Sequence, residues 1–247
     1  MRVIHTKRVS KLKHGFFPVH TCFLRAACLN LLFSHHLGIG MEEYIFLFDF
    51  DGTLIKSTNT VLTLWKNLAQ EFGFLVTKAR LRKKLSSDWQ TMLKKEFRQD
   101  WKEHLLLLKR HFDWYQEQLK TKPLIPELVS FLRTHRFGII SSSFQTIIQH
   151  KIKEYALAPE FVYTSDSLHS SSKERLLAHA IKKNKLDVKR CVYVCDMKQD
   201  ISGAKAHNIK TIGVLWGFHT KNMLKNADML AHTPTQLISM LRRVQQS

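Results

Sequence analysis

The stretch from Tyr44 to Leu54, YIFLFDFDGTL, restricts the fold of this chain more than any other. It begins with an unbroken apolar run, Ile45 to Phe48, which is typical of a strand that is covered on both faces in a parallel sheet. Asp49 and Asp51 follow directly, and residues two apart in an extended strand end point the same way. Because ligands bind at the carboxyl ends of strands in open α/β sheets, we expect both carboxylates to face one site.

Three further segments have the composition of strands and strand-ending loops. FGIISSS (137–143) is an apolar run that ends in hydroxyls, and FVY (161–163) is a short apolar run. Residues 192–218 contain a buried strand, an acidic loop, a short helix and another buried strand. The sequence therefore predicts an α/β fold with a Rossmann-like parallel sheet core, made from residues 41–56 and 123–247.

Residues 57–122 have the pattern of helices, and we expect them to form a helical unit inserted after the first strand. Apolar residues recur at spacings of three and four in two stripes. The stripes are Val61, Trp65, Leu68 and Phe72, then Trp101, Leu105, Leu108, Phe112, Tyr115 and Leu119. We interpret them mainly as the core between two helices, although aromatic stripes can also line a substrate pocket. From Lys56 to Lys122 there are 15 Lys or Arg and 7 Asp or Glu, which fits solvated helix faces or a basic lid over an anionic substrate.

Side chains that follow the later strands are candidates for a phosphate and metal site. Asp196 and Asp200 lie four apart across a predicted strand-to-helix turn. Mg²⁺ keeps several waters, so one direct and one water-mediated carboxylate are sufficient ligands here. Ser141 can donate a hydrogen bond to a phosphate oxygen, or it belongs to a solvated Ser-rich loop. Lys173 opens a predicted helix, where a lysine is usually a surface residue.

These residues together resemble the motifs of a known family. DFDGTL resembles the nucleophile motif of the haloacid dehalogenase (HAD) superfamily, most of whose members are Mg²⁺-dependent phosphatases. Ser141, Lys173 and the Asp196-x-x-x-Asp200 pair resemble its second, third and fourth motifs, in the right order. Helices inserted just after the first motif resemble the phosphoglycolate-phosphatase-like branch, which implies a Rossmann-like core with an inserted α-helical cap domain at residues 57–122.

The resemblance implies a role for each matched position. The implied nucleophile is Asp49, which forms an aspartyl-phosphate, and the implied acid and base is Asp51. HAD members that are dehalogenases lack a carboxylate at the position of Asp51, so a phosphatase is expected, acting on a small phosphate monoester. The implied ligands of Mg²⁺ are Asp49, the Asp51 carbonyl, Asp196 and, through water, Asp200. The implied phosphate-binding residues are Ser141 and Lys173.

Three positions depart from the family pattern. Lys56 stands where many relatives have an acidic residue, which bears on the substrate preference. Cys195 replaces the usual Gly before the metal-binding Asp, where its side chain can crowd the loop. His207 and Asn208 replace an Ala-Gly pair before the last long strand.

Residues 1–40 differ in composition from the rest of the chain. They carry six Lys or Arg and no Asp or Glu, and polar residues interrupt their apolar stretch. We expect a dispensable leader or a mis-assigned start, with Met41 as the true first residue. Organelle targeting and a basic arm that touches membrane or nucleic acid are alternatives.

The overall composition leaves some alternatives open. A formal net charge of +19 over 247 residues also suits a nucleic-acid-binding protein or a nucleic-acid or nucleotide phosphatase, although no nucleic-acid module is recognised. A phosphomutase of the same superfamily would use the same aspartates. Four cysteines without C-x-x-C spacing favour a reducing compartment, and we expect a cytoplasmic protein. No apolar run reaches the length of a membrane span, and the sequence does not indicate an oligomeric state.

Overall fold

The computed structural model describes residues 44–246, except 86–88, 167, 169 and 171, so the predicted leader at 1–40 lies outside the described residues. The described residues contain a six-stranded sheet in which all the paired strands are parallel, in the order β3-β2-β1-β4-β5-β6. The strands are β1 (Ile45–Phe48), β2 (Phe137–Ser141), β3 (Val162–Thr164), β4 (Cys191–Cys195), β5 (Lys210–Val214) and β6 (Met229–Ala231). This order confirms the predicted Rossmann-like α/β core.

The first strand lies in the middle of the sheet, as its unbroken apolar sequence predicts. Phe48 pairs with Ile139 of β2 on one side and with Val194 of β4 on the other. All four residues of β1 are buried. Because the chain runs from β1 toward β2 and returns past β1 to β4, the strand order reverses between β1 and β4. Such a reversal leaves a crevice at the carboxyl ends of these two strands.

Two sets of helices cover the two faces of the sheet. Successive strand residues point to opposite faces, so Phe46 and Phe48 belong to one buried cluster and Leu47 to another. The first cluster includes side chains of α6 (Pro126–Leu132), α7 (Gln145–Glu154) and α10 (Pro234–Gln245). The second includes side chains of α8 (Lys173–Asn184) and α9 (Lys198–Lys205). A single-turn 3₁₀ helix, η2 (Val188–Arg190), precedes β4.

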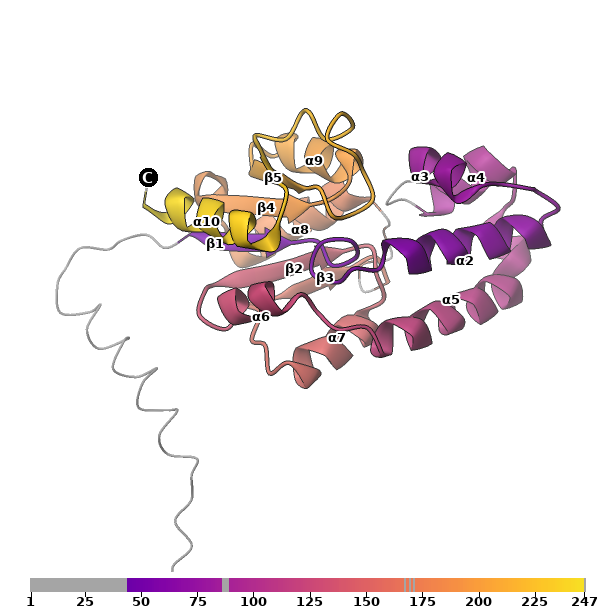
Figure 1. Ribbon diagram of the computed structural model, residues 1–247, viewed down its shortest axis with the longest axis horizontal. Coiled ribbons are helices and arrows are strands. Elements are labelled where there is room, and N and C mark those ends of the chain that lie inside the picture. The colour runs from indigo at the N-terminus through magenta and orange to yellow at the C-terminus, as the bar shows by residue number, and fades with distance from the viewer. Residues whose placement is uncertain (1–43, 86–88, 167, 169, 171, 247) are drawn as a thin grey trace, which may run out of the picture. The chain divides into compact units, whose positions relative to one another are not determined.

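A helical cap follows β1 and precedes α6, as predicted, and Figure 1 shows it beyond one end of the strands. Its elements are α2 (Thr58–Glu71), α3 (Lys78–Lys84), α4 (Trp89–Phe97), the 3₁₀ helix η1 (Trp101–His104) and α5 (Leu105–Lys120). Side chains of α2 and α5 share the first buried cluster with the sheet, so the cap packs onto the core. The predicted residue limits of core and cap stay a prediction.

The second predicted stripe is wrong at one position. Leu105 is 55% exposed, although the spacing predicts that it lies in line with Trp101 and Leu108. The Asp100 side chain accepts a hydrogen bond from the Lys102 N–H and starts the 3₁₀ turn η1. Leu105 is the first residue of α5, directly after this turn, and its side chain faces away from the core.

Among the helices of the described residues, none combines the length and the apolar composition that a membrane-spanning helix requires.

Candidate active site

Asp49 and Asp196 follow neighbouring strand ends, beside the crevice where the strand order reverses. The Asp49 N–H donates a hydrogen bond of 2.9 Å to the carbonyl of Val194, which extends the pairing of β1 with β4 by one residue. Asp49 is 5% exposed and Asp196 is fully buried. The structure therefore brings the predicted first and fourth motifs together at the same edge of the sheet.

The Asp196 carboxylate lies between two glycines. A Cβ added at Gly52 or at Gly217 would overlap its side-chain atoms, so only glycine leaves room at either position. Asp196 Oδ2 accepts a hydrogen bond of 2.7 Å from the Phe218 N–H, whereas Oδ1 is buried and has no hydrogen-bond partner among the described residues. Burial and then the nearby Asp49 charge raise the pKa of Asp196 well above its usual range. A cation at Oδ1 would offset both causes.

Lys173 joins two of the acidic residues. It is the first residue of α8, as predicted, and its Nζ lies 2.6 Å from Asp49 Oδ1 and 3.2 Å from Asp200 Oδ2. The Lys173 side chain is only 3% exposed. Burial alone would lower the pKa of the Lys173 ammonium, but the carboxylates of Asp200 and Asp49 together raise it above its usual value. Lys173 is therefore a fixed buried cation beside Asp49, and the alternative of an ordinary surface lysine is wrong.

The Asp51 carboxylate is hydrogen-bonded to a residue of the cap. The Tyr115 hydroxyl of α5 donates a hydrogen bond of 2.5 Å to Asp51 Oδ1. Burial raises the pKa of Asp51, and the Asp49 charge adds to this effect, whereas hydroxyl groups of Tyr115 and Ser57 oppose it. A carboxyl with a raised pKa holds a proton closer to neutral pH, which a general acid requires. No sequence signal links Tyr115 to this carboxylate.

The serine loop after β2 contributes to the site differently from the prediction. Ser141 is fully buried at the end of the strand, and its Oγ accepts a hydrogen bond of 3.2 Å from the Ser143 N–H. The residues of this loop that line the adjoining cavity are Ser142, Ser143 and Phe144. Ser142 Oγ has no hydrogen-bond partner within the described part of the chain. Ser141 remains the predicted phosphate ligand, and its two serine neighbours are additional donors that the sequence prediction missed.

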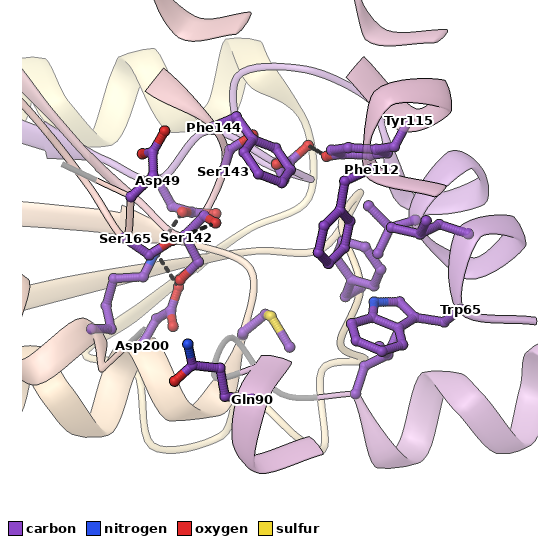
Figure 2. A pocket seen from close by; sticks show the side chains of 18 of the residues that line it. Asp49, Trp65, Gln90, Phe112, Tyr115, Ser142, Ser143, Phe144, Ser165 and Asp200 are labelled. Carbon is purple, nitrogen blue, oxygen red and sulfur yellow. Dashed lines mark hydrogen bonds and ion pairs between the residues drawn. The ribbon is translucent and has the colours of Figure 1, made fainter. Parts of the chain in front are cut away.

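A cavity of about 440 Å³ adjoins these residues. Figure 2 shows Asp49 and Asp200 on one side of it, and Trp65, Phe112 and Tyr115 together on the other. Of the two aromatic stripes, some members are core, such as Leu68 and Leu119, and others line the cavity. The aromatic residues of the lining are Trp65, Trp101, Phe112, Tyr115, Phe144 and Phe218. The alternative that the stripes also line a pocket is therefore confirmed.

A family comparison agrees with this geometry. The family model described as "Haloacid dehalogenase-like hydrolase" matches residues 46–214, which include all four predicted motifs. The chain belongs to this family. This confirms the predicted family. It also confirms the predicted enzyme class, a HAD-like phosphatase.

Relatives of this HAD-like hydrolase carry more than one activity in their names. A phosphoglycolate phosphatase of Synechococcus elongatus is 26% identical over 200 residues, covering 78% of this chain and 94% of that protein. The tyrosine-protein kinase PtkA of Mycobacterium tuberculosis is 24% identical over 213 residues, covering 82% of this chain and 72% of that protein. Among solved structures, a hydrolase from Pseudomonas syringae has a TM-score of 0.71 and 21% identity, covering 81% of this chain and 99% of that one.

The three departures from the family pattern are accommodated by the structure. Lys56 is exposed and does not line the cavity. Cys195 is buried among apolar side chains of the second cluster and is not part of the cavity lining. Asn208 has a φ of 57°. This is the left-handed region, which Asn tolerates better than most residues, so it can replace the usual glycine there.

The acidic residues of this HAD-like hydrolase are the candidate ligands of a metal ion. Among the described residues, no three His, Cys, Asp or Glu side chains form a ready-made metal cluster. Two carboxylates, Asp49 and Asp196, nevertheless lie at adjoining strand ends, and Asp196 Oδ1 is buried without a hydrogen-bond partner there. Mg²⁺ commonly takes only one or two protein carboxylates together with waters and substrate phosphate. The residues present therefore fit a divalent metal ion.

Proposed function

We propose that this hydrolase is a Mg²⁺-dependent phosphatase that cleaves phosphate monoesters through an aspartyl-phosphate at Asp49. One observation supports this most strongly: Lys173 Nζ lies 2.6 Å from Asp49 Oδ1, at the strand end that adjoins Asp196. A carboxylate beside a fixed ammonium, at the edge of a cavity, is suited to attack a phosphoryl group whose charge the ammonium also offsets.

Asp49 performs the first chemical step. One of its carboxylate oxygens forms a bond to phosphorus, and the ester P–O bond breaks with its electron pair on the leaving oxygen. In the second step, a water oxygen bonds to the same phosphorus, and the bond between phosphorus and Asp49 breaks. Inorganic phosphate leaves and the Asp49 carboxylate is restored. Dividing hydrolysis in this way replaces one difficult displacement with two easier ones.

Asp51 moves the proton in both steps. As a carboxylic acid it protonates the leaving alcohol oxygen, and as a carboxylate it then accepts the proton of the attacking water. Burial, which raises the pKa of Asp51, favours the acid form that the first step requires. The hydrogen bond from Tyr115 fixes the orientation of the carboxyl group.

The remaining polar groups bind the transferred phosphoryl group. Lys173, Ser142 and Ser143 line the cavity together with Asp49, where they can contact the equatorial oxygens, and Ser141 stays the phosphate ligand predicted from the sequence. Asp49, Asp196 and the Asp51 carbonyl would hold Mg²⁺, with Asp200 acting through a water. The bound ion supplies positive charge that offsets the carboxylates and the phosphate.

A small phosphorylated metabolite is the substrate class that the named phosphatase relative supports. The cytoplasmic location predicted from the sequence stays a prediction. The two described cysteines, Cys191 and Cys195, are free thiols, which fits a reducing compartment.

The test is Mg²⁺-dependent release of phosphate from para-nitrophenyl phosphate. The protein should release phosphate with Mg²⁺ and not after chelation by EDTA. Asp49→Asn should reduce turnover to background, because an amide does not attack phosphorus. The matched control is Asp113→Asn, the same change at an exposed cap residue paired with Lys109, which should retain full activity. Equal turnover in Asp49→Asn and the unmodified protein would contradict the proposal.

A further inference from the structure

The charges that line the cavity are concentrated at its catalytic end. Four carboxylates belong to the lining, at positions 49, 51, 166 and 200, and Lys173 is the only Lys or Arg among the described lining residues. At the positions that the structure does not describe within 44–246, the sequence has no Lys or Arg either. Lys173 and a bound Mg²⁺ would be the positive charges that offset these carboxylates and the phosphate group of the substrate. A second anionic group on the substrate would find no cation of its own.

Lys173 is already engaged and does not reach farther into the cavity. Its Nζ contacts Asp49 and Asp200, and it also donates a hydrogen bond of 3.2 Å to the carbonyl of Ile140. These three contacts hold the ammonium at the catalytic end beside Asp49, where it can meet a phosphoryl group but cannot reach a group near the cap. A carboxylate placed toward the cap would therefore lose its water without gaining an ion pair, which is costly.

The basic residues of the cap do not compensate for this. None of the 15 Lys or Arg from Lys56 to Lys122 lines the cavity, and none of them is buried. Arg82 is the one that reaches toward the sheet, and it donates a hydrogen bond of 3.1 Å to the carbonyl of Gly217, outside the cavity lining. Among the described residues, the cap therefore places no basic side chain in the lining of this cavity, which favours solvated helix faces as the account of its charge.

The cap side of the cavity is instead apolar and rich in rings. Val61, Leu64 and Trp65 come from α2, Trp101 from η1, and Phe112 from α5. Figure 2 shows Trp65 and Phe112 on the same side of the cavity, across from Asp49. The volume of about 440 Å³ lies within the range of pockets that bury a drug-sized ligand. Glycolate would leave most of this surface uncovered.

We propose that the substrates are phosphate monoesters whose alcohol part carries an uncharged ring, and that esters with a second anionic group, such as phosphoglycolate, are disfavoured. The phosphate lies at Asp49 and Lys173, and the ring packs against Trp65 and Phe112. This inference rests on the proposed phosphatase function and concerns the specificity of the same site. The ring gains burial and edge or face contacts with the aromatic wall.

Two matched pairs of substrates separate the effects of the ring and of the charge. Phenethyl phosphate and ethyl phosphate both release a primary alcohol, so their chemical steps are similar and only the ring differs. We expect the ring to raise kcat/KM by about 10-fold or more. Phosphoglycolate and its neutral amide differ mainly by one charge. We expect kcat/KM to be about 10-fold or more lower for the charged member.

Variants connect the ring preference to the aromatic wall. Phe112→Leu keeps an apolar side chain and removes the ring, whereas Phe112→Ala removes nearly all of the side chain. In both, the ratio of kcat/KM for phenethyl over ethyl phosphate should fall, by about 10-fold in Phe112→Ala. Leu106→Ala is the matched control, because Leu106 belongs to the same helix but is 85% exposed. Its ratio should equal that of the unmodified protein.

The outcomes distinguish the two proposals. The ring specificity is overturned if the protein prefers phosphoglycolate over its amide, or ethyl over phenethyl phosphate. The phosphatase function still stands in that case, provided that Asp49→Asn abolishes the hydrolysis. A ratio that is unchanged in both Phe112 variants likewise overturns the placement of the ring. Failure to hydrolyse any of the four esters with Mg²⁺ overturns the phosphatase function, and the specificity with it.

Discussion

The Tyr115 hydroxyl donates a hydrogen bond of 2.5 Å to Asp51 Oδ1, joining helix α5 of the cap to the loop that follows β1. The two residues are 64 positions apart in the sequence. Burial raises the pKa of the Tyr115 phenol well above its usual range, and the Asp51 charge adds to this effect, so the phenol keeps its proton and remains the donor. The proposed acid and base is therefore oriented by a cap residue.

Tyr115→Phe tests this orientation, because it removes the hydroxyl and preserves the ring. A hydrogen bond to a charged group contributes about 1.5–3 kcal/mol, so we expect kcat to fall by roughly 10-fold or more. The KM for ethyl phosphate should change little, because the phosphate ligands are retained. Steady-state kinetics measure both values.

Tyr155→Phe is the control for the loss of a tyrosine hydroxyl. The Tyr155 hydroxyl accepts a hydrogen bond of 3.3 Å from the Leu124 N–H, away from the cavity lining. Its kcat should equal that of the unmodified protein. Equal kcat values for Tyr115→Phe and the unmodified protein would show that the hydrogen bond does not assist proton transfer.

Local patterns predicted the elements that carry the proposed motifs. The apolar runs before Asp49 and Asp196 are β1 and β4, and Lys173 is the first residue of α8. These predictions are correct because a buried parallel strand requires a continuous apolar sequence. The register of adjacent strands then brings their carboxyl ends together. The family's motif order supplied the pairing of these particular residues.

Contacts between the cap and the core depend on how the cap packs against the core, and local sequence patterns do not predict that packing. The spacing of Tyr115 is equally consistent with a core residue and with a residue that reaches Asp51. The exposure of Leu105, the first residue of α5, depends on what packs against that end of the helix. The same holds for the serine loop, where the end of β2 decides that Ser142, rather than Ser141, lines the cavity.

Gly52→Ala is expected to remove activity by displacing Asp196. The backbone at Gly52 has a φ of +75°, and a Cβ there would overlap the Asp196 carboxylate. The left-handed conformation costs a non-glycine residue about 1–2 kcal/mol, and the overlap adds a shift of the carboxylate. We expect Mg²⁺-dependent phosphate release to fall by about 100-fold, as misplaced catalytic groups commonly cost this much.

Gly73→Ala separates backbone strain from the overlap. Gly73 has a similar φ of +78°, but a Cβ there would meet no atom within 4 Å. Both variants should lower the free energy of unfolding in urea by at least about 1 kcal/mol. Only Gly52→Ala should lose activity. Loss of activity in both variants, or in neither, would contradict the packing of Gly52 against Asp196.

Asp196→Asn tests the metal site without an activity assay. Mg²⁺ at roughly 100 times its Kd should stabilise the fold by about 2.7 kcal/mol and raise Tm by roughly 5 °C. The amide oxygen introduced by this substitution can still accept the hydrogen bond from the Phe218 N–H, but the amide has no charge. We expect Asp196→Asn to lose the Mg²⁺-induced rise in Tm, as measured by thermal unfolding at matched ionic strength.

The metal-free Asp196→Asn protein should be at least as stable as the unmodified one. Burial and the Asp49 charge raise the pKa of Asp196, so its carboxylate is unfavourable in the folded state until a cation binds. An undiminished Mg²⁺-induced rise in Tm in the variant would place the ion elsewhere.

Mass spectrometry of acid-quenched protein reveals whether Asp49 carries the phosphoryl group. Para-nitrophenol is a good leaving group that needs little protonation, so Asp51→Asn should slow the second step more than the first. The Asp51→Asn variant is mixed with para-nitrophenyl phosphate and Mg²⁺ and quenched rapidly with acid. We expect one added phosphoryl group on its peptide that contains Asp49, and none in the double variant Asp49→Asn, Asp51→Asn. A phosphoryl group found on a different residue, or the same labelling in the double variant, would contradict the proposed role of Asp49.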